Sequence, residues 1–198
     1  MNPFIAFLTN YIDLTVDEKA SLENVLESVS FKEGDILLKE KSICKHIIYL
    51  VSGKARSFFI NHEGQEFTWS FHFNDKDSKF ENYFLIDYHS FLSQSPSHLT
   101  IEAIEDVQLI MLSYENLQNL TAVSLKIATL NSRMSEIAYQ NVHNRAFSLL
   151  TLNAKERYNQ LLNKEPYLLN KFKHYLVASY LGIAPQSLSR LRNEIAKS

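Results

Sequence analysis

The order of apolar and polar residues divides the chain into a helical start, a strand-rich middle and a helical end. Residues 4–29 are expected to be helical, because Thr15 followed by Asp17 and Glu18 is typical of a helix start and apolar residues continue at helical spacing. From 31 to 112 the apolar runs are short and rich in Ile, Val, Phe, Tyr and Thr, which indicates strands. The expected strands are 36–38, 46–51, 54–60, 66–73, 100–104 and 108–112. With turn signals at 52–53 and 61–64, they predict an antiparallel jelly-roll barrel.

A second helical pattern covers residues 114–143. Apolar residues recur there in steps of three and four, and Asn141 continues the series: Leu120, Val123, Ile127, Leu130, Met134 and Ile137. So narrow a seam over three heptads is typical of a helix that pairs with a copy of itself. We therefore expect a homodimer through residues 114–143. The alternative is burial of the same stripe against the chain's own barrel.

The last part of the chain is expected to hold one or two helices over 144–170 and then a helix-turn-helix over 174–193. Residues 167–169 are the candidate for a short hairpin between them. Ala178 is small enough for a helix crossing, Gly182 tolerates a tight turn, and Pro185 suits the first turn of a helix. Apolar anchors follow at matching spacing: Val177, Leu181, Ile183, Leu188 and Leu191. The second helix of such a unit usually enters the major groove of DNA.

Charge is distributed unevenly, although the net charge is only −2. Residues 1–143 contain 11 Lys and Arg and 19 Asp and Glu, a balance of −8, whereas residues 144–198 contain 9 and 3, a balance of +6. A basic module on an acidic body suits phosphate binding by one end of the protein. We expect an α+β protein with a sensor domain over 1–113, a dimerisation helix over 114–143 and a DNA-binding domain over 144–198.

Composition excludes several classes of protein. The single cysteine, Cys44, cannot form an intramolecular disulfide or a cysteine-based metal site, and an ordinary structural role is favoured over redox sensing. Neither an 18-residue apolar run nor a signal-peptide pattern occurs in the sequence, so a cytoplasmic protein is expected.

Three segments carry a resemblance to a known family. The pattern Ile48-Tyr49-x-Val51-x-Gly53-x-x-Arg56, the run at 31–37 and the run at 182–190 together resemble the Crp/Fnr family of bacterial transcription regulators. The resemblance implies a cyclic-nucleotide-binding-like barrel, a dimerisation helix and a winged-helix-like DNA-binding domain. It also implies double-stranded DNA as the partner, and RNA polymerase as a further partner if the protein is an activator.

The resemblance also suggests which residues contact DNA. In the family, a Glu-x-x-Ser-Arg or Glu-x-x-Gly-Arg pattern reads bases, and here Gln186, Ser189 and Arg190 occupy those positions. Arginine can donate two hydrogen bonds to guanine, and glutamine can pair with adenine. Because Gln186 replaces the glutamate, a different half-site is expected. The expected phosphate contacts are Ser187, Arg192, Lys171 and Lys173, with His174 as a further candidate.

The sensor part departs from the family pattern. Members that bind cyclic nucleotides use a glycine-containing cassette and an arginine for the phosphate. Residues 80–97 contain no glycine, and neither Lys nor Arg occurs between Lys79 and Lys126. A buried phosphate without a cation or a backbone nest is strongly disfavoured, so we expect no binding of cyclic AMP or cyclic GMP. The aromatic residues of this stretch are interpreted as core or as the lining of an apolar ligand pocket: Tyr83, Phe84, Tyr88 and Phe91, with Leu92.

The sequence leaves the effector open and argues against catalysis. One cysteine cannot hold an iron–sulfur cluster. Haem binding stays open because four histidines are available as ligands: His62, His72, His89 and His98. No cofactor or metal is expected. The histidine pair of metal-dependent jelly-roll enzymes and other catalytic motifs are missing, so the protein is not expected to be an enzyme. The alternatives are a ligand-independent or partner-controlled regulator, and a small-molecule-binding barrel protein without a DNA-binding role. The chain ends soon after residue 195, so no wing hairpin is expected after the reading helix.

Overall fold

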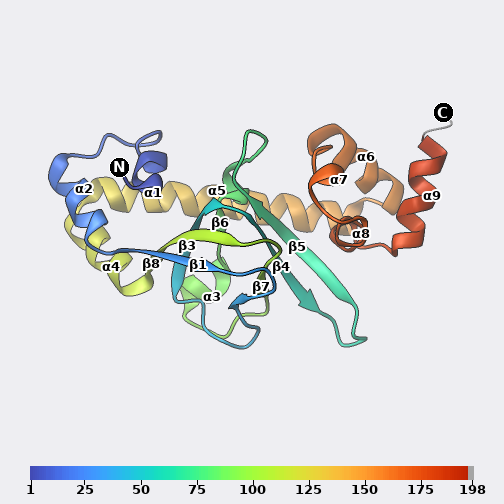
Figure 1. Ribbon diagram of the computed structural model, residues 1–198, viewed down its shortest axis with the longest axis horizontal. Helices are drawn as coiled ribbons and strands as arrows, with labels where there is room; N and C mark the ends of the chain where they lie inside the picture. Colours follow the sequence, from blue (N-terminus) through green and yellow to red (C-terminus); the bar gives the residue numbers. More distant parts are fainter. Residues whose placement is uncertain (196–198) are drawn as a thin grey trace. The chain divides into compact units, whose positions relative to one another are not determined.

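The computed structural model describes residues 1–195 and groups the chain into two compact units (Figure 1). The first unit contains Met1–Ser57 and Phe71–Gln140, and the second contains Phe58–Ser70 and Asn141–Ser198. Within residues 1–195, none of the helices combines the length and the apolar character that crossing a bilayer requires.

The first unit begins with two short helices and a strand that the sequence pattern did not predict. Helix α1 covers Pro3–Leu8 and α2 covers Val16–Glu23, where Thr15 and Glu18 form a reciprocal capping box. The expected helix to residue 29 is wrong, because β1 (Leu26–Phe31) pairs antiparallel with β8 (Val107–Ser113). The apolar spacing fits a helix locally, but the ladder with β8 pairs the backbone of all six residues.

Two four-stranded sheets follow, in the orders β1-β8-β3-β6 and β2-β7-β4-β5. All six expected strands are present. Five of them are β2 (Ile36–Leu38), β3 (His46–Ser52), β4 (Lys54–Ile60), β5 (Glu66–Phe73) and β7 (Thr100–Ala103), and the sixth is β8. Two strands were not expected, β1 and β6 (Phe84–Leu85). A short 3-10 turn, η1 (Phe80–Asn82), and helix α3 (Tyr88–Ser93) connect β5 to β7. The α+β class with antiparallel sheets is confirmed.

Apolar side chains from both sheets and from α1 make one core in the first unit. Leu50, Leu85 and Ile101 are completely buried. The Phe4 ring of α1 stacks on Tyr49 of β3 at a centroid distance of 5.2 Å. This contact attaches the N-terminal helix to the sheet, because aromatic pairs of this kind bury a large apolar area.

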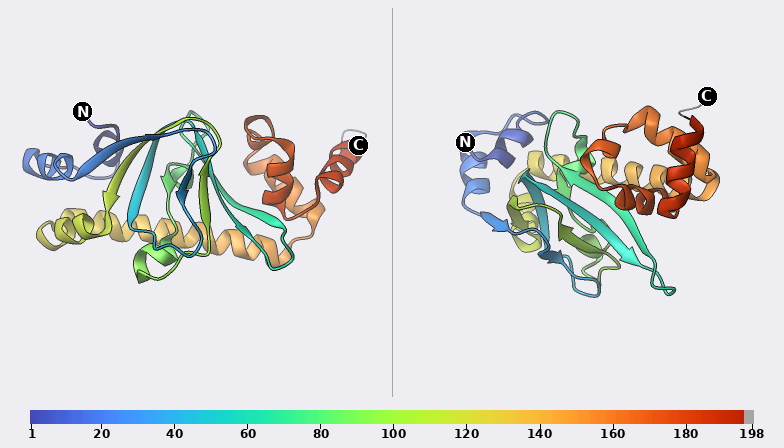
Figure 2. Two further views of the ribbon diagram at one scale, coloured as in Figure 1. Left: turned by 60° about the horizontal axis from the view of Figure 1, so that its bottom comes forward. Right: turned by 45° about the vertical axis from the view of Figure 1, so that its right-hand side comes forward.

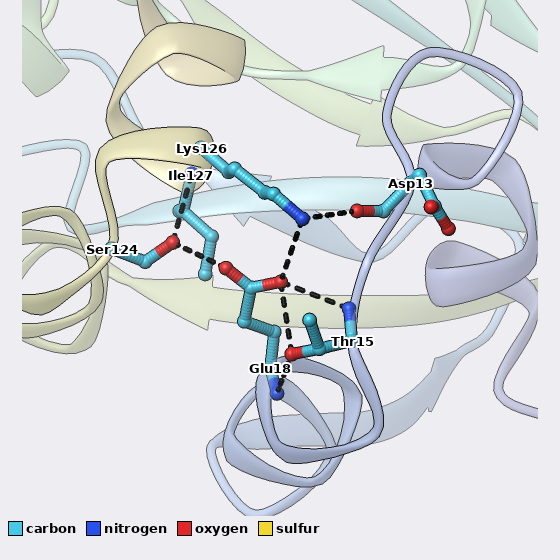
Figure 3. Close-up of polar contacts among 6 residues, drawn as sticks. All are labelled: Asp13, Thr15, Glu18, Ser124, Lys126 and Ile127. Carbon is cyan, nitrogen blue, oxygen red and sulfur yellow. Dashed lines mark hydrogen bonds and ion pairs between the residues drawn. The ribbon is translucent and has the colours of Figure 1, made fainter.

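The expected single helix over 114–143 is interrupted at Ser124, which separates α4 (Tyr114–Val123) from α5 (Leu125–Thr151). The Ser124 hydroxyl accepts the Ile127 N–H at 3.2 Å and donates to Glu18 Oε1 at 2.7 Å (Figure 3). The other Glu18 oxygen accepts the Thr15 N–H at 2.9 Å. The bond from the Thr15 backbone N–H and, to a smaller extent, the bond from the Ser124 hydroxyl lower the pKa of Glu18. One carboxylate therefore joins the N-terminal ends of α2 and α5, beside an open groove of about 360 Å³.

The apolar seam expected at a dimer interface faces the core of its own unit. Leu120, Ile127, Leu130 and Met134 are all buried there, whereas Val123 is 85% exposed. The assignment of these buried residues to a dimer contact is wrong, and the alternative of burial against the chain's own sheets is confirmed for them. Spacing identifies an apolar stripe on a helix, but it does not identify what covers the stripe.

The second unit contains the end of α5 and the four helices that follow it in the chain (Figure 2). They are α6 (Ala154–Lys164), α7 (Leu168–Lys171), α8 (His174–Leu181) and α9 (Pro185–Ile195). The candidate hairpin at 167–169 is wrong, because Leu168 begins α7 and its side chain is buried in the unit.

The turn between β3 and β4 generates a stability prediction. Gly53 has φ +91°, and a Cβ built there would lie 2.2 Å from the Asp106 carbonyl oxygen. Gly34 has φ +88° with nothing within 4 Å, so it isolates the conformational cost. In urea unfolding, we expect Gly34→Ala to cost about 1 kcal/mol and Gly53→Ala about 2 kcal/mol more. Equal losses for the two variants would contradict a role for the close approach.

Candidate nucleic-acid interface

Helices α8 and α9 form the tightly packed pair that the sequence predicts. Val177, Ala178 and Leu188 are completely buried between the helices of this unit. Gly182 ends α8 in the left-handed conformation at φ +66°, and the Ile183 N–H bonds to the Ala178 carbonyl at 3.0 Å. This arrangement satisfies the last carbonyls of α8 and reverses the chain direction before α9 begins.

One face of α9 is polar and exposed. Gln186, Ser189 and Arg190 are all exposed. Gln186 and Arg190 lie on the side of the helix opposite the buried Leu188, and Ser189 lies next to Gln186 on the helix surface. Arg192 is also exposed, while Ser187 is half-buried. The three residues expected to contact bases therefore share one accessible face, and this face can enter a groove without unpacking the core.

The remaining expected phosphate contacts lie at the start of α8. Lys173 immediately precedes the helix and is exposed, and His174 is its first residue. Lys171 ends α7 and is half-buried, with its ammonium 5.8 Å from the centroid of the Tyr167 ring. A helix N-terminus with nearby cations is a suitable environment for a phosphate group.

Two of the arginines that contribute to the positive charge of residues 144–198 bond to the protein's own backbone. Arg157 Nε donates to the Leu181 carbonyl at 2.9 Å, and Arg145 donates to the Tyr180 carbonyl. The Arg145 guanidinium also stacks 3.8 Å above the centroid of the Tyr180 ring, and burial lowers the Arg145 pKa. Both cations thus cap the C-terminal end of α8, where the helix dipole favours positive charge. Sequence alone gave no signal that separates them from DNA-facing arginines.

In the first unit, the segment expected to replace the phosphate cassette is hydrogen-bonded internally through Asp87. Asp87 is buried and caps α3, where Oδ1 accepts the Ser90 N–H at 3.3 Å. Its Oδ2 accepts the Ser97 hydroxyl at 2.7 Å. A carboxylate therefore already bonds the backbone and hydroxyl donors of this loop.

The four histidines are scattered among different environments. His72 is buried and its Nε2 lies 2.7 Å from the Ser57 hydroxyl, and burial lowers its pKa to about 4. The His89 and His98 rings stack at 6.3 Å on the exposed side of α3, and His62 lies in the β4–β5 turn. In the part of the chain that the structure describes, no three His, Cys, Asp or Glu residues gather as a metal site.

The aromatic residues beside α3 and the cysteine serve the core. Phe84 and Phe91 are buried in it, Tyr83 and Tyr88 pack against it, and Leu92 is 56% exposed. This supports core packing for Phe84 and Phe91 over a pocket lining. The Cys44 thiol is also buried, and burial raises its pKa, which opposes thiolate chemistry.

Comparison with known proteins assigns the fold of the segment that contains both sheets. Residues 28–124 match the family model described as cyclic nucleotide-binding domain. This segment has the fold of that domain. None of the curated proteins matches the chain.

Several solved structures resemble the chain over most of its length. FixK2 from Bradyrhizobium japonicum is 16% identical with a TM-score of 0.72, covering 87% of this chain and 85% of FixK2. The c-di-GMP-responsive global regulator CLP from Xanthomonas campestris is 13% identical with a TM-score of 0.69, covering 92% of each chain. A protein of Eubacterium rectale described as a Crp/Fnr-family transcriptional regulator is 20% identical with a TM-score of 0.67, covering 94% and 88%. At these identities the likeness concerns the fold.

Proposed function

We propose that this chain is a homodimeric DNA-binding transcription regulator of the Crp/Fnr type, working in the cytoplasm. The observation that carries the proposal is the exposed face of α9 with Gln186, Ser189 and Arg190, mounted on a buried helix pair. Helix pairs of this kind present the second helix to the major groove. The match of residues 28–124 to a sensor-type domain and the Crp/Fnr-type fold neighbours support it.

Each exposed residue of α9 has a specific task in this proposal. Arg190 donates two hydrogen bonds to guanine O6 and N7, and Gln186 pairs with adenine N6 and N7. Ser187, Arg192, Lys171 and Lys173 contact phosphates and fix the register of the helix on the duplex. If the regulator activates transcription, RNA polymerase is the expected further partner.

The dimer is proposed to use the face of α5 opposite the buried stripe. Leu125 is 84% exposed and Tyr139 is 71% exposed, and both lie on that side of the helix. Further along the same side, Phe147 and Leu150 are 61% and 86% exposed. Pairing of two such faces covers these side chains and sets two α9 helices into successive major grooves, about 34–36 Å apart.

The sensor is proposed to work without cyclic AMP or cyclic GMP. A phosphate placed at the start of α3 would meet the Asp87 carboxylate, which already bonds the Ser90 N–H and the Ser97 hydroxyl. The phosphate and the Asp87 carboxylate would repel each other, and residues 80–125 contain no Lys or Arg to offset this repulsion. The internal bonds of this loop favour a regulator whose DNA binding is controlled by its own abundance or by a protein partner.

Substitution of Arg190 tests the base-reading assignment. We expect Arg190→Ala to weaken binding to an operator selected in vitro by about 1–3 kcal/mol, because the bidentate contact is lost. Arg190→Lys keeps the charge and is expected to lose most of the sequence preference, since a single ammonium cannot make the same pair of bonds. Lys155→Ala, an exposed cation on α6, is the control for charge alone. An unchanged footprint for Arg190→Ala would refute the assignment of α9.

Substitution of Leu125 tests the dimer face. We expect Leu125→Glu to shift the protein to monomers in sedimentation velocity, since a carboxylate would be buried at an apolar contact. The dissociation constant is expected to rise by about tenfold or more. Val16→Glu is the matched control, because Val16 is 82% exposed on α2. A wild-type protein that is monomeric at all concentrations would contradict the dimer itself.

Calorimetry tests the sensor. We expect cyclic AMP and cyclic GMP to bind the wild-type protein with a dissociation constant above about 1 mM, too weak for a working signal. Operator affinity is expected to stay the same when either nucleotide is added. Micromolar binding by either one would show that the Asp87 loop opens and accepts a phosphate.

A further inference from the structure

The second unit contains a piece of the sensor sequence. The turn of the β4–β5 hairpin, Phe58–Ser70, groups with α6–α9 rather than with the rest of the sheets. Its β5 strand is the outer strand of its sheet, and outer strands present main-chain groups for further bonding. The hairpin therefore belongs to the same compact unit as the α8–α9 pair.

Ser179 on α8 makes the polar part of this contact. Its hydroxyl accepts the Thr68 N–H at 2.8 Å and donates to the Glu66 carbonyl at 2.9 Å. One hydroxyl thus bonds an N–H and a C=O two residues apart along β5, as a neighbouring strand would. Thr68 is completely buried at this point, so its N–H depends on the Ser179 hydroxyl for a partner on this side.

Phe67 and Arg145 make the apolar and cationic parts of the same contact. A Cβ built on Gly182 would lie 3.1 Å from Cε2 of the Phe67 ring, so the ring rests directly against the turn between α8 and α9. The Arg145 guanidinium lies 5.5 Å from the centroid of that ring and 3.8 Å from the Tyr180 centroid. It also donates to the Thr68 carbonyl at 3.4 Å and to the Tyr180 carbonyl. Hairpin, α5 and α8 therefore meet at one guanidinium.

We propose that Ser179 and Phe67 are positioning residues for DNA reading, which hold the turn before α9 against the β4–β5 hairpin and so set the placement of Gln186, Ser189 and Arg190. The inference rests on the proposed DNA-binding function and extends it to residues that do not touch DNA. Hydrogen-bonded base contacts require placement to within about 0.5 Å, which supporting contacts must provide. The hairpin contacts reach α8 through Ser179 and the turn through Gly182.

The experiment measures sequence preference as the ratio of operator to non-operator affinity in competition titrations, using the full chain and an operator selected by the wild type. We expect Ser179→Ala and Phe67→Leu to lower this ratio by about three- to tenfold, with non-operator binding unchanged. Ser179→Thr keeps the hydroxyl and is expected to preserve the ratio. Thr151→Ala is the matched control, because the Thr151 hydroxyl donates to the Phe147 carbonyl of its own helix at 2.7 Å.

Two results would overturn the inference in distinguishable ways. If Arg190→Ala abolishes sequence preference while Ser179→Ala and Phe67→Leu leave the ratio unchanged, α9 reads DNA without help from the hairpin. If the wild type itself shows no preference for any sequence, the proposed function fails, and the positioning role fails with it. Thermal unfolding of each variant separates a loss of preference from a loss of fold, and Phe67→Leu keeps most of the apolar volume at its site.

Discussion

The C-terminal end of α8 is the constraint on which the proposed interface depends. A helix leaves its last carbonyls without partners within the helix. Here the carbonyls from Ala178 to Leu181 accept hydrogen bonds from backbone N–H groups of the Gly182 turn and from the side chains of Arg145 and Arg157. Positive charge at this end is also favoured by the helix dipole. Because only three residues separate α8 from α9, the bonds that end α8 also help to determine where the exposed face of α9 lies.

The segment that matches the cyclic nucleotide-binding domain satisfies many of its polar groups internally. Residues 28–124 contain the two antiparallel sheets and helix α3. In the loop that contains α3, the buried Asp87 carboxylate accepts the Ser90 N–H and the Ser97 hydroxyl. The buried Ser57–His72 pair and the Arg56–Glu102 ion pair at 2.6 Å likewise satisfy polar groups internally.

Helix α5 illustrates the difference between a stripe and an interface. One side is buried under the sheets through Ile127, Leu130 and Met134, and the other side leaves Leu125 and Tyr139 exposed. The helix can therefore belong to its own core and still present a second face to a partner. The break at Ser124, bonded through Glu18, sets the point at which the helix begins.

Local sequence determined much of this protein: six strands, the Thr15–Glu18 cap, the Gly182 turn and the α8–α9 pair all follow from residue spacing and from backbone preferences that act within a few residues. Tertiary structure decided the rest. Leu26–Phe31 is a strand because β8 lies beside it, and Arg145 binds carbonyls because the hairpin and α8 meet there. Periodicity and charge describe one segment at a time, whereas a ladder partner, a covered face or a buried cation depends on residues that are distant in the sequence.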